Sequence, residues 1–437
     1  MSKAMKGEKQ ALVPRLRFPE FREAGEWEIK SLGDVCSVLQ GYGFPTDMQG
    51  KLDGEYPFCK VSDVSKAVAE NGGHLDDAAN YVGKQELSKL RAKLIPVGST
   101  VFAKIGEALR LNRRAYVSRE CLIDNNVVGL KAADGSADDY FIYISSQLID
   151  LNEHCGGAVP SVNKTTLEAV EVVVPSLDEQ QKIADCLSSL DALIAAQADK
   201  IDALKNHKKG LMQQLLPREG ETVPRLRFPE FRDAGEWELS QLGEKVKLLS
   251  GFPFKSQDIS EDSSGIPLMR GINITEGYIR HNRDIDRFYL GDVEQLQKYR
   301  LKVNDLVIGM DGSKVGKNSA VVTEKDAGSL LIQRVARLRT ECIFTIQFIF
   351  QHIHSSKFHS YVDRINTSGG IPHISAKQIN EFEICFPPTK QEQQKIADCL
   401  SSVDEALAAH TKKLEALKTQ KKGLMQQLFP NPQAVSI

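Results

Sequence analysis

The sequence predicts a mixed α/β (α+β) protein with internal pseudo-twofold symmetry. In this fold two globular domains are separated by two long helices that pack as an antiparallel coiled coil. Three observations predict it. The segment VPRLRFPEFREAGEWE at 13–28 returns as VPRLRFPEFRDAGEWE at 223–238. A long helical stretch at 176–217 returns in the same register at 389–430. The regions between these repeats differ in sequence and carry short β-branched runs, which are typical of strands.

The repeat divides the chain into two halves, each with an entry segment, a globular region and a helix. A chain of 437 residues is also too long for one ordinary domain. The predicted segments are an N-terminal entry segment (1–25), a first globular domain (26–175), a central helix (176–217), a linker with the second entry segment (218–235), a second globular domain (236–388), a C-terminal helix (389–430) and a tail (431–437).

Composition excludes several classes of protein. The formal net charge of −2 excludes a uniformly basic nucleic-acid binder, so any such surface must be local. The eight cysteines form no CxxC pair, which indicates reduced thiols rather than a disulfide framework. We find no signal peptide and no apolar run of membrane-spanning length. We therefore expect a soluble, cytoplasmic protein without membrane contact.

Both helical stretches carry apolar residues at alternating steps of four and three, the spacing of a coiled-coil seam. Ser176-x-x-Glu179 and Thr389-x-x-Glu392 are capping boxes at their starts, and a proline ends each stretch. If the symmetry holds, the chain near Pro14 should lie beside the end of the second helix. The predicted seam is Ile183, Leu187, Leu190, Ile194, Gln197, Ile201 and Leu204 in the first helix, and Ile396, Leu400, Val403, Leu407, His410, Leu414 and Leu417 in the second.

Polar and glycine positions within these helices leave alternatives open. Gln197 and His410 fall near the middle of the antiparallel pair, where they either fix the register or mark a solvated break. Lys208 and Lys421 occupy the other polar positions of the seam. The Lys-Lys-Gly sequences ending at Gly210 and Gly423 either cap the helices or lie inside them. The heptad pattern continues beyond both glycines, which favours continuous helices.

The two globular regions predict strands at corresponding places. We expect strands at 100–102 and 127–130 in the first region, and at 306–308 and 320–323 in the second. A helix should follow at 140–149 and at 345–362 respectively. Each region therefore reads as a small mixed α/β domain.

The duplicated helix openings and the two divergent domains together resemble the specificity subunit of type I DNA restriction–modification systems. The helices open with P-x3-E-Q-x2-I-A-x2-L-x3-D at 175–191 and, with one extra residue, at 387–404. The resemblance covers nearly the whole chain. It implies a non-catalytic subunit whose two target-recognition domains read the halves of a bipartite, asymmetric site in double-stranded DNA. It also implies that the helices form a spacer and dock two methyltransferase subunits, while motor-nuclease subunits complete the restriction enzyme. S-adenosylmethionine, ATP and Mg²⁺ would then belong to those partners, and this chain would hold no cofactor.

Two rival functions fit the sequence less well. An enzyme with its own active site is disfavoured. Phe386-Pro387-Pro388 lacks the Asn or Asp of the amino-methyltransferase motif, and DGSKVGKN at 311–318 departs from a phosphate loop. His352-x-His354 lacks further metal ligands, so no metal site is expected. A protein-binding scaffold would explain the helices but would leave two divergent domains without a purpose.

Cationic and amide side chains in corresponding loops are the first candidates for DNA contact, because cations bind phosphates and forked or amide side chains bind base edges. The stretch 104–119 is the densest basic stretch of the first domain, and its counterpart lies near 314–339. The alternative is a solvated turn. The residues are Lys104, Arg110, Asn112, Arg113, Arg114 and Arg119 in the first domain, and Lys314, Lys317, Asn318, Gln333, Arg334, Arg337 and Arg339 in the second.

Three further pairs of segments are candidates. GYGFP at 41–45 and GFPFK at 251–255 place Tyr42, Phe44, Phe252, Phe254 and Lys255 either against DNA or, as the favoured alternative, over a small core. Loops around Gly156-Gly157 and Gly369-Gly370 carry Asn163, Lys164, His373 and Lys377 nearby. The entry motif is nearly the same in both halves, so it should pack on helix ends or hold methyltransferase subunits rather than read different bases. Its residues are Arg15, Arg17, Phe18, Phe21, Arg225, Arg227, Phe228 and Phe231.

Overall fold

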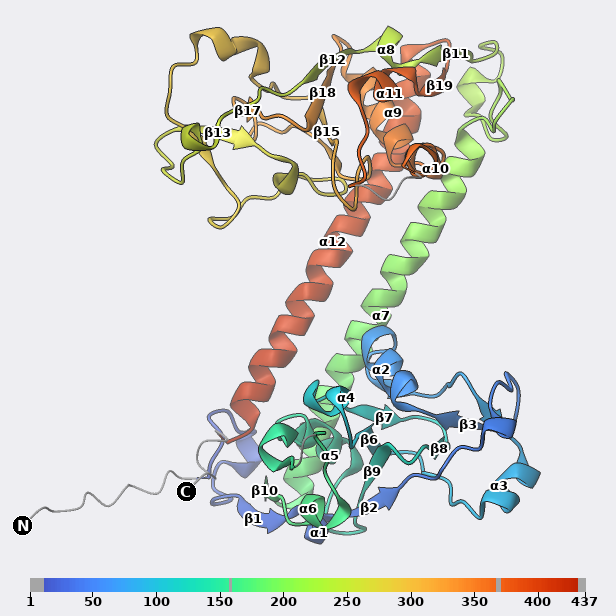
Figure 1. The fold of residues 1–437 in the computed structure, drawn as a ribbon, viewed down its shortest axis with the longest axis vertical. Coiled ribbons are helices and arrows are strands. Elements are labelled where there is room, and N and C mark those ends of the chain that lie inside the picture. Colours follow the sequence, from blue (N-terminus) through green and yellow to red (C-terminus); the bar gives the residue numbers. More distant parts are fainter. Residues whose placement is uncertain (1–11, 157–158, 367–370, 431–437) are drawn as a thin grey trace, which may run out of the picture. The chain divides into compact units, whose positions relative to one another are not determined.

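The computed structural model describes residues 12–156, 159–366 and 371–430. By internal contacts these residues form two units: unit 1 comprises residues up to 200 and from 410 onward, and unit 2 comprises 201–409. Two helices of 39 residues each, α7 (Leu177–Leu215) and α12 (Lys390–Leu428), contribute a segment to both units (Figure 1). Both continue through Gly210 and Gly423, as the heptad pattern predicts. Part of the entry segment, Gly157, Gly369, Gly370 and the predicted tail lie outside the described residues.

Unit 1 contains a five-stranded sheet in the order β2-β9-β6-β7-β4 and a three-stranded sheet in the order β5-β3-β8. Strands β1 and β10 form a separate antiparallel pair. The strands are β1 (Glu28–Ser31), β2 (Cys36–Gln40), β3 (Tyr56–Cys59), β4 (His74–Leu75), β5 (Tyr81–Val82), β6 (Thr100–Ala103), β7 (Ala115–Val117), β8 (Leu122–Ile123), β9 (Val127–Ala132) and β10 (Glu171–Val174). The helices of the globule are α1 (Leu32–Val35), α2 (Val61–Glu70), α3 (Lys84–Leu90), α4 (Glu107–Arg110), α5 (Asp139–Ser146) and α6 (Lys164–Glu168).

Unit 2 repeats this topology with one strand fewer in the larger sheet. Its four-stranded sheet has the order β12-β18-β15-β16, and its three-stranded sheet has the order β14-β13-β17. In both units the middle strand of the three-stranded sheet pairs in parallel with the strand that leads into the larger sheet (β3 with β8, β13 with β17). The strands are β11 (Glu238–Gln241), β12 (Lys247–Ser250), β13 (Ile266–Met269), β14 (Phe288–Tyr289), β15 (Leu306–Gly309), β16 (Ser319–Val321), β17 (Leu330–Leu331), β18 (Val335–Arg339) and β19 (Glu383–Phe386), and the helices are α8 (Leu242–Lys245), α9 (Ile343–Ile353), α10 (Ser356–Ile365) and α11 (Ala376–Glu381).

Two of the sequence predictions for unit 2 need correction. The single helix expected at 345–362 is wrong, because α9 ends at Ile353 and Ser355 caps a second helix, α10, by accepting a hydrogen bond from the Phe358 backbone N–H at 3.3 Å. The strand expected at 320–323 begins and ends earlier, at Ser319 and Val321. A serine side chain that satisfies a free N–H at a new helix start explains the break.

The two long helices run antiparallel within each unit. In unit 1 the Gln197 amide donates to Nδ1 of His410 at 2.7 Å and to its carbonyl at 2.9 Å. Lys421 Nζ contacts an Asp191 carboxylate oxygen at 2.6 Å in the same unit. In unit 2 Lys208 Nζ lies 2.7 Å from both carboxylate oxygens of Asp404. Gln197 and His410 therefore pair with each other, and Lys208 and Lys421 each pair with an aspartate of the opposite helix, which supports a register-fixing role over a solvated break.

The residues at the ends of the two long helices belong to the cores of the two units. Ile183, Leu187, Leu428 and Phe429 pack in one core with Trp27, Phe141 and strand residues of unit 1. Leu215, Leu216, Ile396 and Leu400 do the same in unit 2 around Trp237 and Phe348. The middle seam residues Ile194, Leu204, Leu407, Leu414 and Leu417 are only half-buried. The helices are thus anchored at their ends by globular cores, and the exposed part of the seam is shorter than the heptad pattern alone suggests.

The entry motif packs on helix ends in both units. Arg17 forms a bidentate pair with Glu179 at 2.8 and 2.7 Å, and Arg227 pairs in the same way with Glu392 at 2.7 and 2.8 Å. Backbone N–H groups of Leu16 and Leu226 donate at 2.9 Å to the carbonyls of Gln427 and Gln214. Each motif therefore joins the start of one long helix to the end of the other, and the expected proximity of the chain near Pro14 to the end of α12 is confirmed.

The capping boxes form only in part. Ser176 and Thr389 accept from the backbone N–H of Glu179 at 3.4 Å and of Glu392 at 3.2 Å, as predicted. The glutamate carboxylates, however, bind the entry-motif arginines instead of turning back to the helix start. A charged bidentate partner outcompetes a single backbone N–H for a carboxylate.

Burial makes unit 2 sensitive to acid. His352 lies in the core against Phe348, and its Nε2 has no hydrogen-bond partner among the described residues. Burial lowers the pKa of His352 to about 3, and it also lowers the pKa of His354. An unfolded histidine titrates near 6.5, so the unfolded chain takes up protons first and stability falls as the pH drops from about 6.5 toward 3.

We therefore expect the free energy of unfolding to fall by about 2 kcal/mol between pH 7 and pH 5 through His352 alone. The variant His352→Leu should lose this contribution to the pH dependence while it keeps a side chain that packs on Phe348. Urea unfolding of both proteins at the two pH values measures the difference. Equal slopes with pH would show that His352 does not set the acid sensitivity.

Candidate functional site

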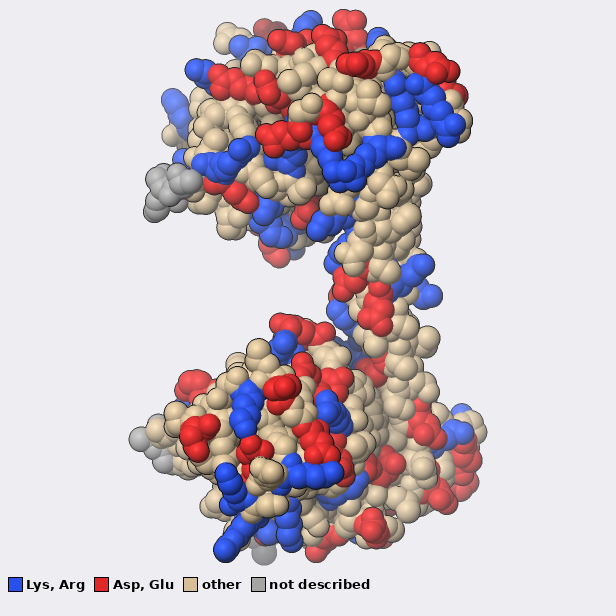
Figure 2. Space-filling view, turned by 90° about the vertical axis from the view of Figure 1, so that its right-hand side faces the viewer, with Lys and Arg blue, Asp and Glu red and all other residues tan. Residues whose placement is uncertain are grey.

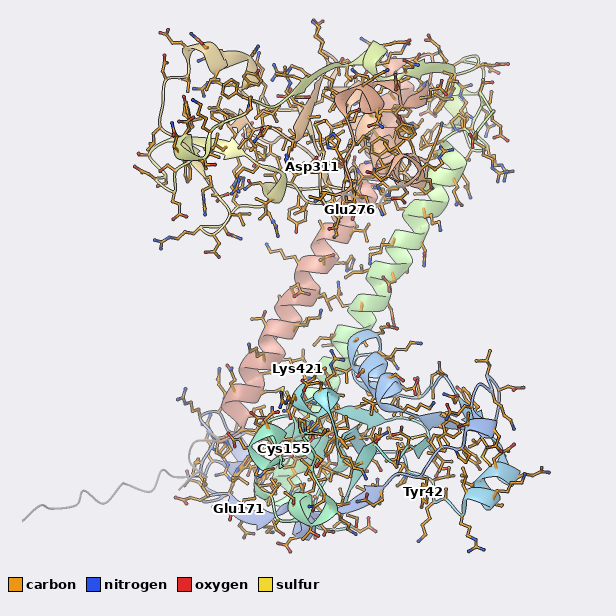
Figure 3. All side chains as sticks on the ribbon, in the orientation of Figure 1. Tyr42, Cys155, Glu171, Glu276, Asp311 and Lys421 are labelled. Atoms are coloured by element: carbon orange, nitrogen blue, oxygen red, sulfur yellow. The ribbon has the colours of Figure 1, made fainter. Side chains whose placement is uncertain are left out.

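Three loops of unit 2 meet around Asp311. This residue lies in the loop between β15 and β16 and is labelled in Figure 3. Its carboxylate contacts Nε of Arg334, from the turn between β17 and β18, at 3.0 Å, and it is hydrogen-bonded to Nδ1 of His373, from the loop before α11. The Gly312 backbone N–H donates to the Pro372 carbonyl at 3.1 Å. Loops far apart in sequence thus form one polar surface.

The corresponding three loops meet in unit 1. Gly106 donates to the Pro160 carbonyl at 2.8 Å, as Gly312 does to Pro372. Lys104 N–H donates to the Asn126 carbonyl at 2.9 Å, and in unit 2 Met310 N–H donates to the Arg334 carbonyl at the same distance. The backbone framework is therefore shared, while the side chains that it carries differ.

A groove of about 500 Å³ lies beside this surface in unit 2. Its lining combines cationic, amide and apolar side chains, namely Arg270, Gln333, Arg334, Ile272 and Ile371. Ile272 and Ile371 are 45% and 78% exposed, although they are aliphatic. Guanidinium and amide groups beside exposed apolar surface suit a ligand with flat faces and polar edges, and nucleic-acid bases have this character.

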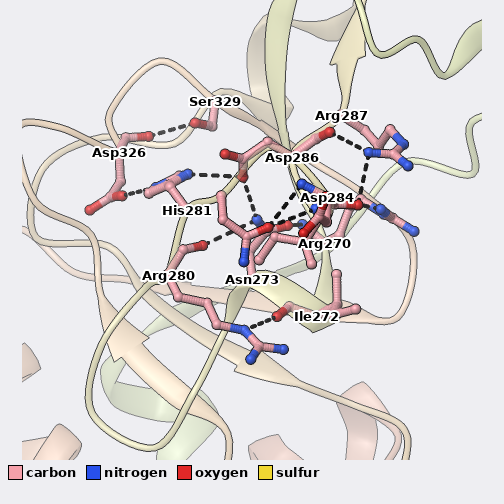
Figure 4. Close-up of polar contacts among 12 residues, drawn as sticks. Arg270, Ile272, Asn273, Arg280, His281, Asp284, Asp286, Arg287, Asp326 and Ser329 are labelled. Carbon is pink, nitrogen blue, oxygen red and sulfur yellow. Dashed lines mark hydrogen bonds and ion pairs between the residues drawn. The ribbon is translucent and has the colours of Figure 1, made fainter. Parts of the chain in front are cut away.

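One wall of the groove is held by a network of buried and half-buried polar groups (Figure 4). His281 joins Asp286 at 3.1 Å through Nδ1 and Asp326 at 2.8 Å through Nε2. Asn273 donates to the same Asp286 carboxylate at 2.9 Å. Arg270 donates to the Ile285 carbonyl at 3.0 Å. These contacts fix the segment that carries Arg270 and Ile272 against the turn before β17.

The cationic stretch predicted in unit 1 separates into exposed and structural residues. Arg110 is exposed and pairs only loosely with Glu107 at 3.4 Å, and Lys104 reaches the Gln40 side chain at 3.0 Å. Asn112 and Arg114 instead hold the chain after α5: the Asn112 amide donates to the Ile149 carbonyl at 2.9 Å and accepts from Arg114 at 3.0 Å.

Arg114 is 4% exposed and lies over the Phe102 ring at 4.3 Å. Burial lowers the pKa of its guanidinium to about 9. These contacts give Arg114 and Asn112 a role in packing. Lys104, Arg110 and Arg113, which are at least half-exposed, are the better candidates for DNA contact in this stretch.

The corresponding residues of unit 2 divide in the same way. Lys314 is exposed, and Lys317 and Asn318 are half-exposed, in the β15–β16 loop. Arg334 is 70% exposed. Arg339 is engaged in a bidentate pair with the buried Asp305 at 2.5 and 2.6 Å, and Arg337 donates to the Lys298 carbonyl at 3.0 Å, so both serve the fold.

The aromatic loops cover small cores. Phe44 stacks on the buried Phe58 at 3.8 Å, and the Tyr42 hydroxyl accepts from the Lys93 N–H at 2.9 Å. Phe254 is 5% exposed and packs against Tyr289 and Phe252. The contacts support the core-covering alternative for these four aromatic residues, while Lys255 is exposed and stays a candidate for phosphate.

The remaining candidates have structural contacts of their own. Asn163 caps α6 by accepting from the Thr166 N–H at 2.8 Å, and Lys164 and Lys377 approach glutamates one turn away at 3.5 and 3.6 Å. His373 belongs to the Asp311 cluster. Arg15 and Arg225 of the entry motif are exposed, and Phe18 and Phe228 pack against the cores.

Sequence reasoning missed Asn125 and Asn126, which are exposed in the turn between β8 and β9, and Arg270. The signal for the turn was a pair of polar residues between two apolar runs, LID-NN-VVGL and LLI-QR-VARL, at corresponding places in the two halves. Counting charges does not find it, because the first pair is neutral.

Other properties of the described residues bear on function. Lys/Arg and Asp/Glu side chains are interspersed over each unit on the face shown in Figure 2. Within the described ranges no three His, Cys, Asp or Glu residues are grouped to hold a metal ion. None of the helices there combines the length and apolar content that crossing a membrane requires.

Comparison with known proteins gives a consistent result. The family model described as "Type I restriction modification DNA specificity domain" matches residues 24–206 and 234–419. The type I restriction enzyme MjaVIII specificity subunit of Methanocaldococcus jannaschii is 24% identical over 95% of this chain and 93% of its own. The EcoAI specificity subunit of Escherichia coli is 30% identical over 51% of this chain and 36% of its own. The crystal structure of a type I restriction–modification S subunit from M. genitalium shares the fold, with a TM-score of 0.63 at 14% identity over 96% of this chain and 99% of that one.

Proposed function

Because the chain belongs to the type I restriction–modification DNA specificity family, with two matched domains, we propose that it reads a bipartite, asymmetric target in double-stranded DNA. The chain is a specificity subunit, a non-catalytic component of its enzyme. One recognition domain would read each half of the target. The observation that carries this proposal is the shared three-loop framework of units 1 and 2, which displays different exposed side chains in each.

The exposed cations around each framework supply the proposed phosphate contacts. In unit 1 these are the exposed Arg110 with the half-exposed Lys104 and Arg113, and in unit 2 they are the exposed Lys314 and Lys255 with the half-exposed Lys317. Phosphate contacts orient a protein on the duplex without selecting a sequence, so selection must come from other side chains in the same loops. The near-neutral net charge agrees with binding that is confined to these surfaces.

We further propose that the long helices and the entry motifs dock two methyltransferase subunits, and that motor-nuclease subunits join that complex in the cytoplasm. The support is the near-identity of these segments in the two halves, since identical partners require identical surfaces. Arg15 and Arg225 remain exposed for such contacts, whereas Arg17 and Arg227 are used within each unit. S-adenosylmethionine, ATP and Mg²⁺ would be bound by the partners, which would extrude the target base for methylation.

Selection from a random-sequence DNA library by the complex with methyltransferase subunits tests the proposal. We expect enrichment of two short, unlike motifs at a fixed spacing. A protein-binding scaffold would enrich no sequence, and that outcome would overturn the proposed function. Tight binding of S-adenosylmethionine by the chain alone would instead favour an enzyme with its own active site.

A further inference from the structure

In each unit a turn leads from the strand that pairs in parallel in the smaller sheet into the larger sheet. This turn joins β8 to β9 in unit 1 and β17 to β18 in unit 2, and it is built alike in both. We call its two tip residues the tip pair: Asn125-Asn126 in unit 1 and Gln333-Arg334 in unit 2. Tyr42 N–H donates to the Ile123 carbonyl before the first tip pair, and Phe252 N–H donates to the Leu331 carbonyl before the second, both at 2.9 Å. The carbonyl of the second tip residue accepts from Lys104 in one unit and from Met310 in the other.

The tip pairs are held by backbone hydrogen bonds and are exposed to solvent. All four tip residues are exposed, while the strand residues that follow them are completely buried, with Val127 and Val128 at 0% in unit 1 and Val335 and Ala336 at 0% in unit 2. A residue at a fixed backbone position between buried strands loses little further freedom when it contacts a ligand, which favours specific contacts.

The side chains differ between units where the backbone does not. Unit 1 displays two amides, and unit 2 displays an amide and a guanidinium. Asn and Gln amides match the N6 and N7 edge of adenine, and the arginine fork matches O6 and N7 of guanine. Two domains that read different half-sites need different side chains at the same backbone positions.

The Arg334 side chain can leave its present contact with Asp311. Its backbone has φ 68°, its side chain is 70% exposed, and its guanidinium pairs with Asp311 at 3.0 Å. Exposed ion pairs contribute little to stability, so the guanidinium can leave Asp311 for a base at small cost. Asp311 is itself held by His373, and both Asp311 and Arg334 line the groove together with Gln333, Arg270 and Ile272.

We propose that the tip pairs are the base-reading elements of the two domains. Gln333-Arg334 contacts an adenine and a guanine edge in one half-site, and Asn125-Asn126 contacts adenine edges in the other. The cations nearby, Lys104 in unit 1 and Arg270 in unit 2, bind flanking phosphates. This inference rests on the proposed function, because it assigns the bases of the same bipartite target to particular side chains.

The test uses the assembled complex with its methyltransferase subunits and a random-sequence duplex library. For Arg334→Ala we expect the preference for one guanine, in one half-site only, to fall roughly ten- to hundredfold. The converse variant, Asn125→Gln with Asn126→Arg, should acquire a guanine preference in the other half-site and leave the first unchanged. The unaltered half-site reports that each variant is folded and assembled. Arg283→Ala, an exposed arginine that does not line the groove, is the matched control and should keep both motifs.

Failure of the proposed function and failure of the tip-pair inference give different outcomes in this experiment. If the wild-type complex selects no motif, the proposed function fails. If the wild type selects a bipartite motif and Arg334→Ala selects the same one, the function stands and the tip-pair inference is overturned. A uniform loss of affinity without a change of motif would also overturn it, because it would show that Arg334 contacts only phosphate. A whole-loop exchange of 104–119 is a poorer test, since it removes the Asn112 and Arg114 contacts that hold the domain together.

Discussion

Replacing Arg227 by alanine is expected to lower the free energy of unfolding by about 3–5 kcal/mol. The Glu392 side chain is completely buried, at 0% exposure, and its bidentate partner is the Arg227 guanidinium, whose side chain is 8% exposed. The same arginine also donates to the Gly235 carbonyl at 2.6 Å, and this contact closes the entry segment. Without the guanidinium a buried carboxylate would be left unpaired at the start of α12, and it would have to take up a proton or draw water into the core.

Denaturant unfolding of the full chain measures this effect, and the entry motif provides its own control. Arg225 lies two residues earlier and is exposed, so Arg225→Ala should change stability by less than about 0.5 kcal/mol. The double variant Arg227→Met with Glu392→Gln removes both charges and should recover a large part of the loss. If Arg227→Ala were as stable as Arg225→Ala, the pair would not anchor the helix. Arg17→Ala tests the equivalent pair with Glu179 in unit 1.

The frame of this protein could be predicted because it rests on repetition and periodicity. The heptad pattern predicts α7 and α12, including their passage through Gly210 and Gly423, and the polar positions Gln197 and His410 meet as an antiparallel arrangement requires. Pattern alone could not assign the partner of Glu179 or Glu392, because a carboxylate near a helix start fits both a capping box and an ion pair. The partner is set by Arg17 and Arg227, which lie more than 160 residues away.

The candidate site was less accessible to sequence reasoning because charge does not reveal burial. Arg110 and Arg114 count equally in a basic stretch, yet one is exposed and the other lies under the chain after α5 against Phe102. Conversely, the neutral Asn125 and Asn126 escape a search for cations although they are exposed. The difference depends on which loop ends face solvent, and this is decided by long-range strand pairing.

The second large expected effect is on stability, and it concerns Gly41 and Gly251, the glycines that begin the two aromatic loops at 41–45 and 251–255. A Cβ built on Gly41 would lie 1.8 Å from the Asp124 carbonyl oxygen, and one built on Gly251 would lie 1.9 Å from that of Ile332. Real Cβ atoms do not approach a carbonyl this closely, so the backbone of one segment would have to move. These carbonyls belong to the residues immediately before the tip pairs, and the parallel bridges of Tyr42 with Asp124 and Phe252 with Ile332 are made at the same points.

Gly41→Ala is therefore expected to destabilise unit 1 by about 3 kcal/mol, the upper part of the range for inserting a methyl group into a packed site. Gly43→Ala is the matched control: it lies in the same loop, a Cβ there meets no atom within 4 Å, and its φ does not require glycine, so stability should stay within about 0.5 kcal/mol of wild type. Denaturant unfolding compares the two variants.

Because the collision displaces the turn that carries Asn125 and Asn126, Gly41→Ala should also weaken selection in one half-site, whereas Gly43→Ala should not. Equal stability of both variants would show that the loop yields without cost, and the tip pair would then lack the rigid support on which its proposed role depends.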